Sequence, residues 1–146
     1  MTHVRQQLRS QAKTLITGLG TTGANVFARR LFQLEQDQLP CWSVMIGDEE
    51  IDNNLGDCQD RIVRLEFDGW ARELDGETLA NKLDTMLEEL EAVMVKSGFT
   101  VALKSLDLLE IEVDVDIDDT DHAFGMLTAV YAARYATAEG APGTAI

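Results

Sequence analysis

The sequence predicts an α+β domain in which a mixed or antiparallel sheet is flanked by an N-terminal and a central helix. Apolar residues recur at three- and four-residue spacing over residues 3–17 and again over 77–96, which indicates two amphipathic helices. Residues 61–74 and 109–117 instead alternate between apolar and polar side chains, a pattern typical of half-buried antiparallel strands. Because 146 residues suffice for one core and no linker interrupts them, we expect a single domain over residues 1–137.

The N-terminal helix carries signals for its two ends. Thr2 is suited to cap its first turn, and Gly18 is suited to end its last turn. Beyond it, Val26 and Phe27 begin a short extended piece that continues to Leu31 and Phe32. Pro40 marks the start of a strand over residues 41–46.

The middle of the chain predicts a loop, a long strand and the central helix. Residues 47–59 combine acids with turn formers, so we expect an exposed loop there. Gly69 predicts a bulge in the strand 61–74, and Gly98 fits the C-terminal cap of the central helix. Residues 99–107 read as a further strand ahead of the acidic strand 109–117.

The pattern of residues 125–137 is compatible with either a helix or a strand. Their alanines favour a helix, whereas their threonine, valine and tyrosine residues favour a strand. We expect a strand, because it would pair with the acidic strand 109–117 across a short turn. The last residues, 138–146, are small and polar, and we expect a flexible tail.

The composition limits the partners of this protein. Twelve basic residues face 26 acidic ones, which gives a net charge of −14. Such a surface repels nucleic acid and anionic lipid. No apolar run reaches the roughly 18 residues of a membrane span, and the N-terminus is polar, so we expect neither a membrane segment nor a secretory leader. Cys41 and Cys58 are the only cysteines, and we expect them to be reduced cytosolic thiols.

Two short motifs resemble ligand sites without their context. Gly18, Gly20 and Gly23 have the spacing of a dinucleotide fingerprint, but a helix precedes them and an extended piece follows, which is the reverse of what that site needs. Asp114, Asp116 and Asp118 resemble the start of a calcium loop, but the glycine and glutamate that complete such a loop are missing. We therefore expect no cofactor and no metal.

Catalytic chemistry has little support in the sequence. His122 follows Asp121 and could act as a base, but no nucleophile stands at a recognisable spacing from it. With two histidines and two scattered cysteines, a zinc site is equally poorly supported. We expect a protein that is not an enzyme, and a small hydrolase or metal-binding enzyme using the acidic cluster stays as a rival hypothesis.

Four residues are candidates for a subunit interface. Trp42 and Trp70 each lie on a predicted strand, where they either pack in the core or anchor a contact, since tryptophan is a favoured interface residue. Arg29 and Arg30 would suit a contact with acids of a neighbouring subunit, or would simply be solvated beside a strand.

The order of the pieces resembles the tail terminator proteins of long-tailed bacteriophages. The resemblance covers residues 3–137 and is carried by order and spacing rather than by one strong motif. After the leading helix its pieces are T-T-G-A-N-V-F at 21–27, L-P-C-W-S-V at 39–44, G-D-E-E at 47–50, the long strand, the central helix ending in K-S-G, and L-T-A-V-Y-A-A-R-Y-A-T at 127–137.

The resemblance implies a structural role in a virion tail that is assembled in the host cytoplasm. Subunits of this family close into a hexameric ring on the last ring of tail-tube protein, stop tube growth and offer a platform to the neck and head-completion proteins. DNA passes through the ring, and there are no catalytic residues to carry over. A neighbouring neck protein, such as a head–tail connector or tail-completion subunit, is the alternative reading.

This role would account for the negative charge. A channel that conducts DNA must not bind it, and acidic walls repel phosphate. The candidates for the wall come from the predicted loop and from the polar face of the acidic strand. They are Asp48, Glu49, Glu50, Glu110, Glu112, Asp114 and Asp116.

Overall fold

Two α-helices, one short 3-10 helix and five strands lie in the part of the chain that the computed structural model describes, namely residues 2–27, 39–117 and 122–146. In chain order they are α1 (Val4–Ile16), β1 (Val26–Phe27), β2 (Cys41–Leu55), β3 (Cys58–Glu73), α2 (Gly76–Val93), a short 3-10 helix (Lys96–Gly98), β4 (Ser105–Ile117) and β5 (Ala123–Ala138). The order of helices and strands confirms the α+β class.

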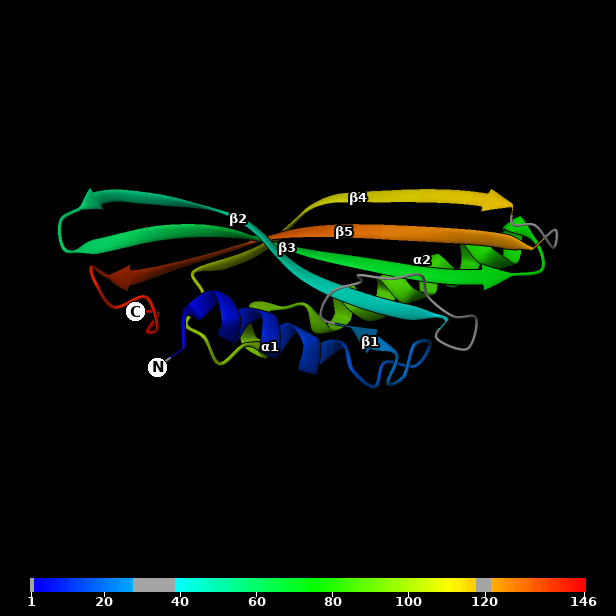
Figure 1. The fold of residues 1–146 in the computed structure, drawn as a ribbon, viewed down its shortest axis with the longest axis horizontal. Helices are drawn as coiled ribbons and strands as arrows, with labels where there is room; N and C mark the ends of the chain where they lie inside the picture. The colour runs from blue at the N-terminus through cyan, green and yellow to red at the C-terminus, as the bar shows by residue number, and fades with distance from the viewer. Residues whose placement is uncertain (1, 28–38, 118–121) are drawn as a thin grey trace.

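The five strands form one mixed sheet in the order β1-β2-β3-β5-β4 (Figure 1). The short β1 runs parallel to β2, and the other neighbours are antiparallel. Both helices lie on the same side of the sheet, and the β2–β3 hairpin extends beyond them at one end (Figure 1). The domain therefore has two layers, with one sheet face turned towards the helices and the other turned away.

The core lies between the helices and the sheet. Val4, Leu8, Ala12 and Ile16 of α1 are fully buried, as the spacing of the N-terminal helix predicts. In α2 the buried face is Leu79, Leu83, Met86 and Leu90. The sheet contributes apolar side chains from alternate positions of β2, β3 and β5. The buried apolar stripe, rather than helix propensity, is what holds these helices in place.

The helix ends differ in part from the sequence signals. His3, not Thr2, caps α1, because its Nδ1 accepts a hydrogen bond from the backbone N–H of Arg5 at 3.1 Å. Gly18 follows the end of α1 with a φ of 90°, the left-handed conformation expected of a helix stop. Gly98 does not cap α2, which ends at Val93, five residues earlier, and belongs to the 3-10 helix instead.

The predicted loop 47–59 is wrong. β2 and β3 continue as a hairpin, with Asp52 opposite Asp60 and Leu55 opposite Cys58, and only Gly56 and Asp57 form the turn. This part of the hairpin is held by backbone pairing of β2 with β3 and of β3 with β5, and the side chains buried there include polar ones such as Arg61 and Thr137. The prediction failed because this end of the hairpin packs polar side chains, among them Glu49 and Arg61, where other strands bury apolar ones.

β4 also replaces two predicted strands by one. Residues 99–104 are not a strand, and β4 runs from Ser105 to Ile117 with an irregular register between Leu108 and Glu110. The apolar positions are even before this point, at Leu106 and Leu108, and odd after it. The extra residue of the bulge absorbs this change of phase, which in the sequence looks like a break between strands.

The C-terminal segment forms β5, which confirms the choice of strand over helix. After it the chain turns back, and Ala145 makes an isolated bridge with Thr137. The backbone N–H of Val4 donates to the carbonyl of Pro142 at 2.9 Å, so the tail lies against the start of α1. The flexibility of residues 138–146 stays a prediction. Leu31 and Phe32 lie outside the described residues.

Candidate functional site

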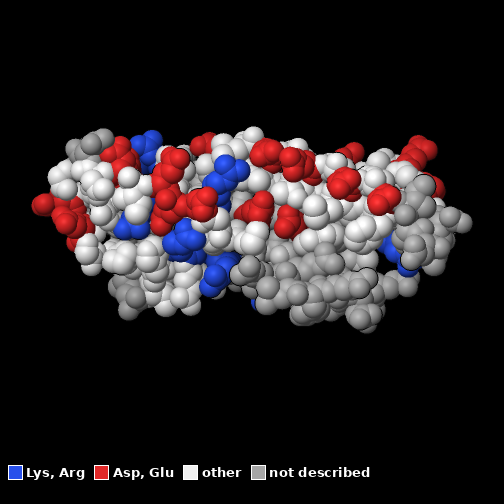
Figure 2. Space-filling model, turned by 45° about the horizontal axis from the view of Figure 1, so that its top comes forward, with Lys and Arg blue, Asp and Glu red and all other residues white. Residues whose placement is uncertain are grey.

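Acidic side chains gather on the sheet face that is turned away from the helices, called here the open face. Residues paired across neighbouring strands point to the same side of a sheet. Glu66, Val130 and Glu110 form one such row, and Asp68, Thr128 and Glu112 form the next. Asp114 and Asp116 of β4 continue this face beside Met126 and Phe124. Figure 2 shows acidic side chains following one another along this side of the molecule, with basic ones gathered towards the hairpin.

The crowding of these acids has an electrostatic consequence. The pKa of Glu66 is raised, first because the side chain is partly buried and then because Asp68, Glu110 and Glu112 lie near it. Arg64 partly offsets this effect, and its Nη2 lies 3.9 Å from Oε2 of Glu110. Both members of that ion pair are half exposed, so the pair is weak. The open face therefore presents a net negative potential.

The hairpin adds two more acids to the open face. Glu50 lies opposite Ile62, which in turn lies opposite Arg134, and all three face away from the helices. Asp48 and Glu50 line a shallow depression together with Ile62, Arg64 and Leu109. The structure thus brings Asp48 and Glu50 onto the same face as Glu110, Glu112, Asp114 and Asp116. The sequence predicts a loop for the first two and a strand for the other four.

Glu49 points to the opposite side and is engaged within the subunit. Its side chain is 9% exposed and accepts a hydrogen bond from the hydroxyl of Tyr135. Nη1 of Arg61 lies 3.5 Å and Nη1 of Arg5 lies 3.8 Å from Oε2 of the same carboxylate. Burial, followed by this bond and the charge of Glu49, raises the pKa of Tyr135. Glu49 therefore joins the hairpin to α1 and is not an exposed acid.

A bulge explains why Glu49 departs from its neighbours. Ile46 pairs with Leu65 and Glu49 pairs with Val63, so two residues of β2, Gly47 and Asp48, stand opposite the single residue Arg64. The extra residue turns Glu49 to the helix side and leaves Asp48 and Glu50 on the open side. Simple alternation from Met45 would have placed Glu49 on the open face.

The proposed interface residues are differently placed. Trp42 is fully buried against the core, and its Nε1 has no hydrogen-bond partner among the described residues. Trp70 is 4% exposed although it lies on the open side of β3. Both tryptophans are thus inaccessible in this subunit, which favours packing over contact. Arg29 and Arg30 lie outside the described residues.

The outer edge of the sheet is a feature that the sequence did not reveal. On the helix side of β4, Ile111, Val113 and Val115 are 42%, 53% and 46% exposed. The alternation over residues 109–117 predicts a half-buried strand, in which this apolar row would be the covered one. α2 lies over β3 and β5 and contacts them, whereas β4 is the outermost strand, beyond β5 (Figure 1). Alternation shows that a strand has an apolar face but does not show whether another element covers it.

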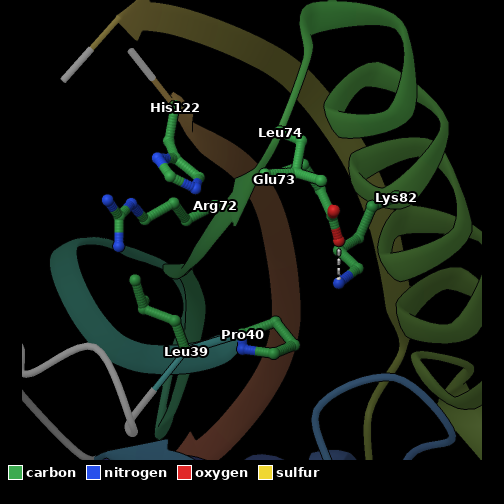
Figure 3. Close-up of a pocket in the computed structure, with 7 residues that line it drawn as sticks. All are labelled: Leu39, Pro40, Arg72, Glu73, Leu74, Lys82 and His122. Carbon is green, nitrogen blue, oxygen red and sulfur yellow. Dashed lines mark ion pairs between the residues drawn. The ribbon is translucent and has the colours of Figure 1, made fainter. Parts of the chain in front are cut away.

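A pocket lies where β3 ends and β5 begins (Figure 3). It brings together basic groups from three parts of the chain, and Lys82 of α2 is ion-paired with Glu73 at one side of it. Among the described residues that line it there is no serine, threonine or cysteine. The lining residues are Leu39, Pro40, Arg72, Glu73, Leu74, Lys82 and His122.

The glycine-rich turn after α1 is closed by its own bonds. The N–H of Gly18 donates to Gly23 and the N–H of Gly23 donates to Leu19, both at 2.8 Å. The N–H and hydroxyl of Thr21 donate to the carboxylate of Glu89 on α2 at 3.0 Å. These amide groups are therefore occupied by the protein, and the motif is a structural turn rather than a phosphate site.

Within the described ranges, no group of three or more His, Cys, Asp or Glu side chains is placed to hold a metal ion. Asp118 of the calcium-like motif lies outside those ranges. The described helices include none that is long and apolar enough to cross a membrane.

Comparison with known proteins relates the chain to others by fold. No protein-family model matches it, and no curated protein matches it in sequence. Among solved structures that it resembles is a chain from the virion of a native gene transfer agent particle, with a TM-score of 0.52 and 15% identity. The similarity covers 90% of each chain. At this identity the comparison shows that the two chains share a fold.

Proposed function

We propose that this protein is a tail terminator, a structural subunit that forms a ring of six on the end of a virion tail tube. The observation that carries the proposal is the fold shared with a chain of a gene transfer agent virion over nearly the whole of both chains. The order of sequence pieces that resembles the terminator family supports the same role. In this role the ring contacts the tail-tube protein on one side and the neck or head-completion proteins on the other.

The two-layer fold suits a ring around a channel. With the open face turned inward, α1 and α2 form the outer layer. The exposed acids Asp48, Glu50, Glu110, Glu112, Asp114 and Asp116 then line the passage. DNA that moves through such a channel meets like charge from every subunit and does not adhere. Glu49 has no part in this wall, because it is bound to Arg61 and Tyr135.

A neighbouring neck protein is the second candidate. The fold similarity favours it equally, because a connector or tail-completion subunit would also belong to a virion and would also surround the DNA. The two candidates differ in what their loss does. Without a terminator the tube keeps growing, whereas without a connector the tube has its normal length but does not join the capsid.

The test is electron microscopy of particles made with and without this chain. We expect overlong tails in its absence. In the complete particle we expect a six-fold ring of this subunit between the last tube ring and the neck. Tails of normal length in its absence, or density for the chain at another layer, would exclude the terminator role. A monomeric protein that binds Mn²⁺ or Ca²⁺ tightly through the acidic cluster, and is missing from the particle, would favour the enzyme alternative.

A further inference from the structure

At both edges of the sheet, a strand has backbone N–H and C=O groups without a strand partner among the described residues. β4 is the last described strand on one side, and 12 of its 13 residues pair with β5. On the other side β1 pairs with Trp42 and Ser43 of β2, and the described part of the chain supplies no further strand along this edge of β2. Unpaired edges of this kind are templates for pairing with another chain.

The directions of the strands make these two edges compatible with each other. β2 and β5 run one way, and β3 and β4 run the other way. If a second copy continues the sheet in the same orientation, its β2 lies antiparallel to β4 of the first copy. The sheet then keeps its alternation across the junction, and the contact joins two different surfaces, as a closed ring requires.

Apolar residues on both edges lie on the helix side of the sheet. β4 offers Ile111, Val113 and Val115, and β2 offers Ile51, which is 47% exposed. The carbonyl of Gly47 accepts a hydrogen bond from Nη2 of Arg5 at 2.8 Å, so the available part of β2 begins beyond the bulge. Pairing of β4 with this part of β2 would bury these apolar side chains together and satisfy the free backbone groups.

The open face opposes the same pairing. It would bring Glu50 and Asp52 of one copy beside Glu110, Glu112 and Asp114 of the next. Like charges opposite one another in a sheet are destabilising, and salt screens exposed charges of this kind. The contact therefore combines an attractive apolar side with a repulsive acidic side.

We propose that β4 binds the part of β2 beyond the Gly47–Asp48 bulge in a second copy of this chain, and that repulsion between their acidic rows keeps the subunits apart until the charge is screened or the tube gathers them. This inference rests on the proposed ring and names the surface through which it closes. It makes assembly dependent on salt, so that free subunits do not form rings or fibres before they meet a tube.

The experiment measures the assembly state of the full-length chain by sedimentation velocity between about 0.05 M and about 1 M NaCl, where the Debye length falls to about 3 Å. We expect monomers at low salt and oligomers at high salt. Combined Glu110→Gln, Glu112→Gln and Asp114→Asn substitutions should tighten association at low salt by about tenfold or more. The control neutralises three acids of α2, with Glu77→Gln, Asp84→Asn and Glu88→Gln, and should behave like the unmodified chain.

Two neutral substitutions identify the edges. Val113→Asn on β4 and Ile51→Asn on β2 should each abolish the salt-induced oligomers, and both side chains are exposed, so the fold should survive. Circular dichroism checks that it does. A mixture of the two variants should still form dimers, because each retains one intact edge, but should not form rings. This complementation separates pairing of β4 with β2 from pairing of one edge with itself.

The outcomes decide between the alternatives. If the neutralised variant stays monomeric at every salt concentration, or if both asparagine variants assemble normally, the edge pairing is wrong. If a partner protein, rather than a second copy, covers β4 in the particle, the pairing is also wrong. A six-fold ring in the virion whose subunits touch through other surfaces would overturn this inference and leave the terminator role intact.

Discussion

Gly69 on β3 stands directly opposite Trp42 on β2, and the absence of a side chain at Gly69 makes room for the indole. A Cβ atom built at Gly69 would lie 2.9 Å from Cζ3 of Trp42 and 3.0 Å from Cε of Met86. The register through Gly69 is regular, with Trp42 on one side and Leu127 on the other, so the predicted bulge is wrong. The glycine serves close packing of α2 and an aromatic ring against the sheet.

Gly69→Ala should therefore destabilise the fold. Trp42 is fully buried and its ring is rigid, so the clash forces a shift in the core that costs about 1–3 kcal/mol. Chemical denaturation measures the change. Gly76→Ala is the matched control, because nothing lies within 4 Å of a Cβ atom there and it should change stability by less than about 0.5 kcal/mol. Equal effects of the two substitutions would contradict the packing role of Gly69.

Leu83 and Leu87 differ in burial although they are one helical turn apart. Leu83 is 1% exposed and contacts the core, whereas Leu87 is only partly buried at its margin. Leu83→Ala should cost about 2–5 kcal/mol, as the removal of buried leucines usually does. Leu87→Ala should cost clearly less, about 1–2 kcal/mol. Thermal or chemical unfolding that ranks them in the other order would show that α2 presents a different face to the sheet.

The carboxyl of Glu66 makes stability depend on pH. Its folded pKa lies above the ordinary 4.5, because of burial and the nearby acids Asp68, Glu110 and Glu112. Because the folded pKa is raised, the protonated carboxyl of Glu66 contributes its full stabilisation at pH values below the unfolded pKa. This stabilisation is lost as the pH rises through the folded pKa. Glu66→Gln should therefore be more stable than the unmodified chain at neutral pH, and this advantage should vanish below the unfolded pKa.

Asp60 provides the contrasting case for the same titration. Hydrogen bonds from Arg134 and then Lys104 lower its pKa, so its contribution is present above the unfolded pKa and is lost as the pH falls through the folded one. Asp60→Asn should reduce the loss of stability that occurs as the pH falls. Glu66→Gln should instead reduce the loss of stability that occurs as the pH rises through the folded pKa of Glu66. Unfolding curves between about pH 2 and pH 8 test both, and identical curves for the two variants would contradict these assignments.

Periodicity predicted the helices and the buried strand faces because these elements meet the core along a stripe. The spacing of Leu79, Leu83 and Leu90 predicts the apolar face of α2 that packs on the core. The far half of the β2–β3 hairpin packs polar side chains such as Glu49 and Arg61 on its helix side, so its pairing leaves no apolar pattern in the sequence. Alternation in β4 shows two chemically different faces, but whether α2 reaches far enough to cover Val113 depends on the tertiary arrangement.

The same limits apply to the candidate site. The acids were recognised as a group by composition and alternation, but their common face depends on strand order, which the sequence did not provide. The bulge at Gly47 and Asp48 decides that Glu49 turns inward. No local signal at Glu49 distinguishes it from Asp48 or Glu50, because its partners Arg61 and Tyr135 lie 12 and 86 residues away.

The last prediction concerns the charge of the proposed channel. Clustered like charges in a narrow, low-dielectric passage raise the local potential, so reversing them should matter more than reversing acids on the outer layer. Combined Glu110→Lys, Glu112→Lys and Asp114→Lys substitutions should leave tails assembled but slow the ejection of DNA, because each lysine can bind a phosphate. The slowing should weaken with salt, with a log–log slope of about −0.9 for each phosphate contact. The control replaces Glu77, Asp84 and Glu88 of α2 with lysine. These residues lie on the helix layer, so ejection should stay unchanged.

Normal ejection by the β4 variant, in particles whose six-fold ring is intact, would show that Glu110, Glu112 and Asp114 do not face the DNA.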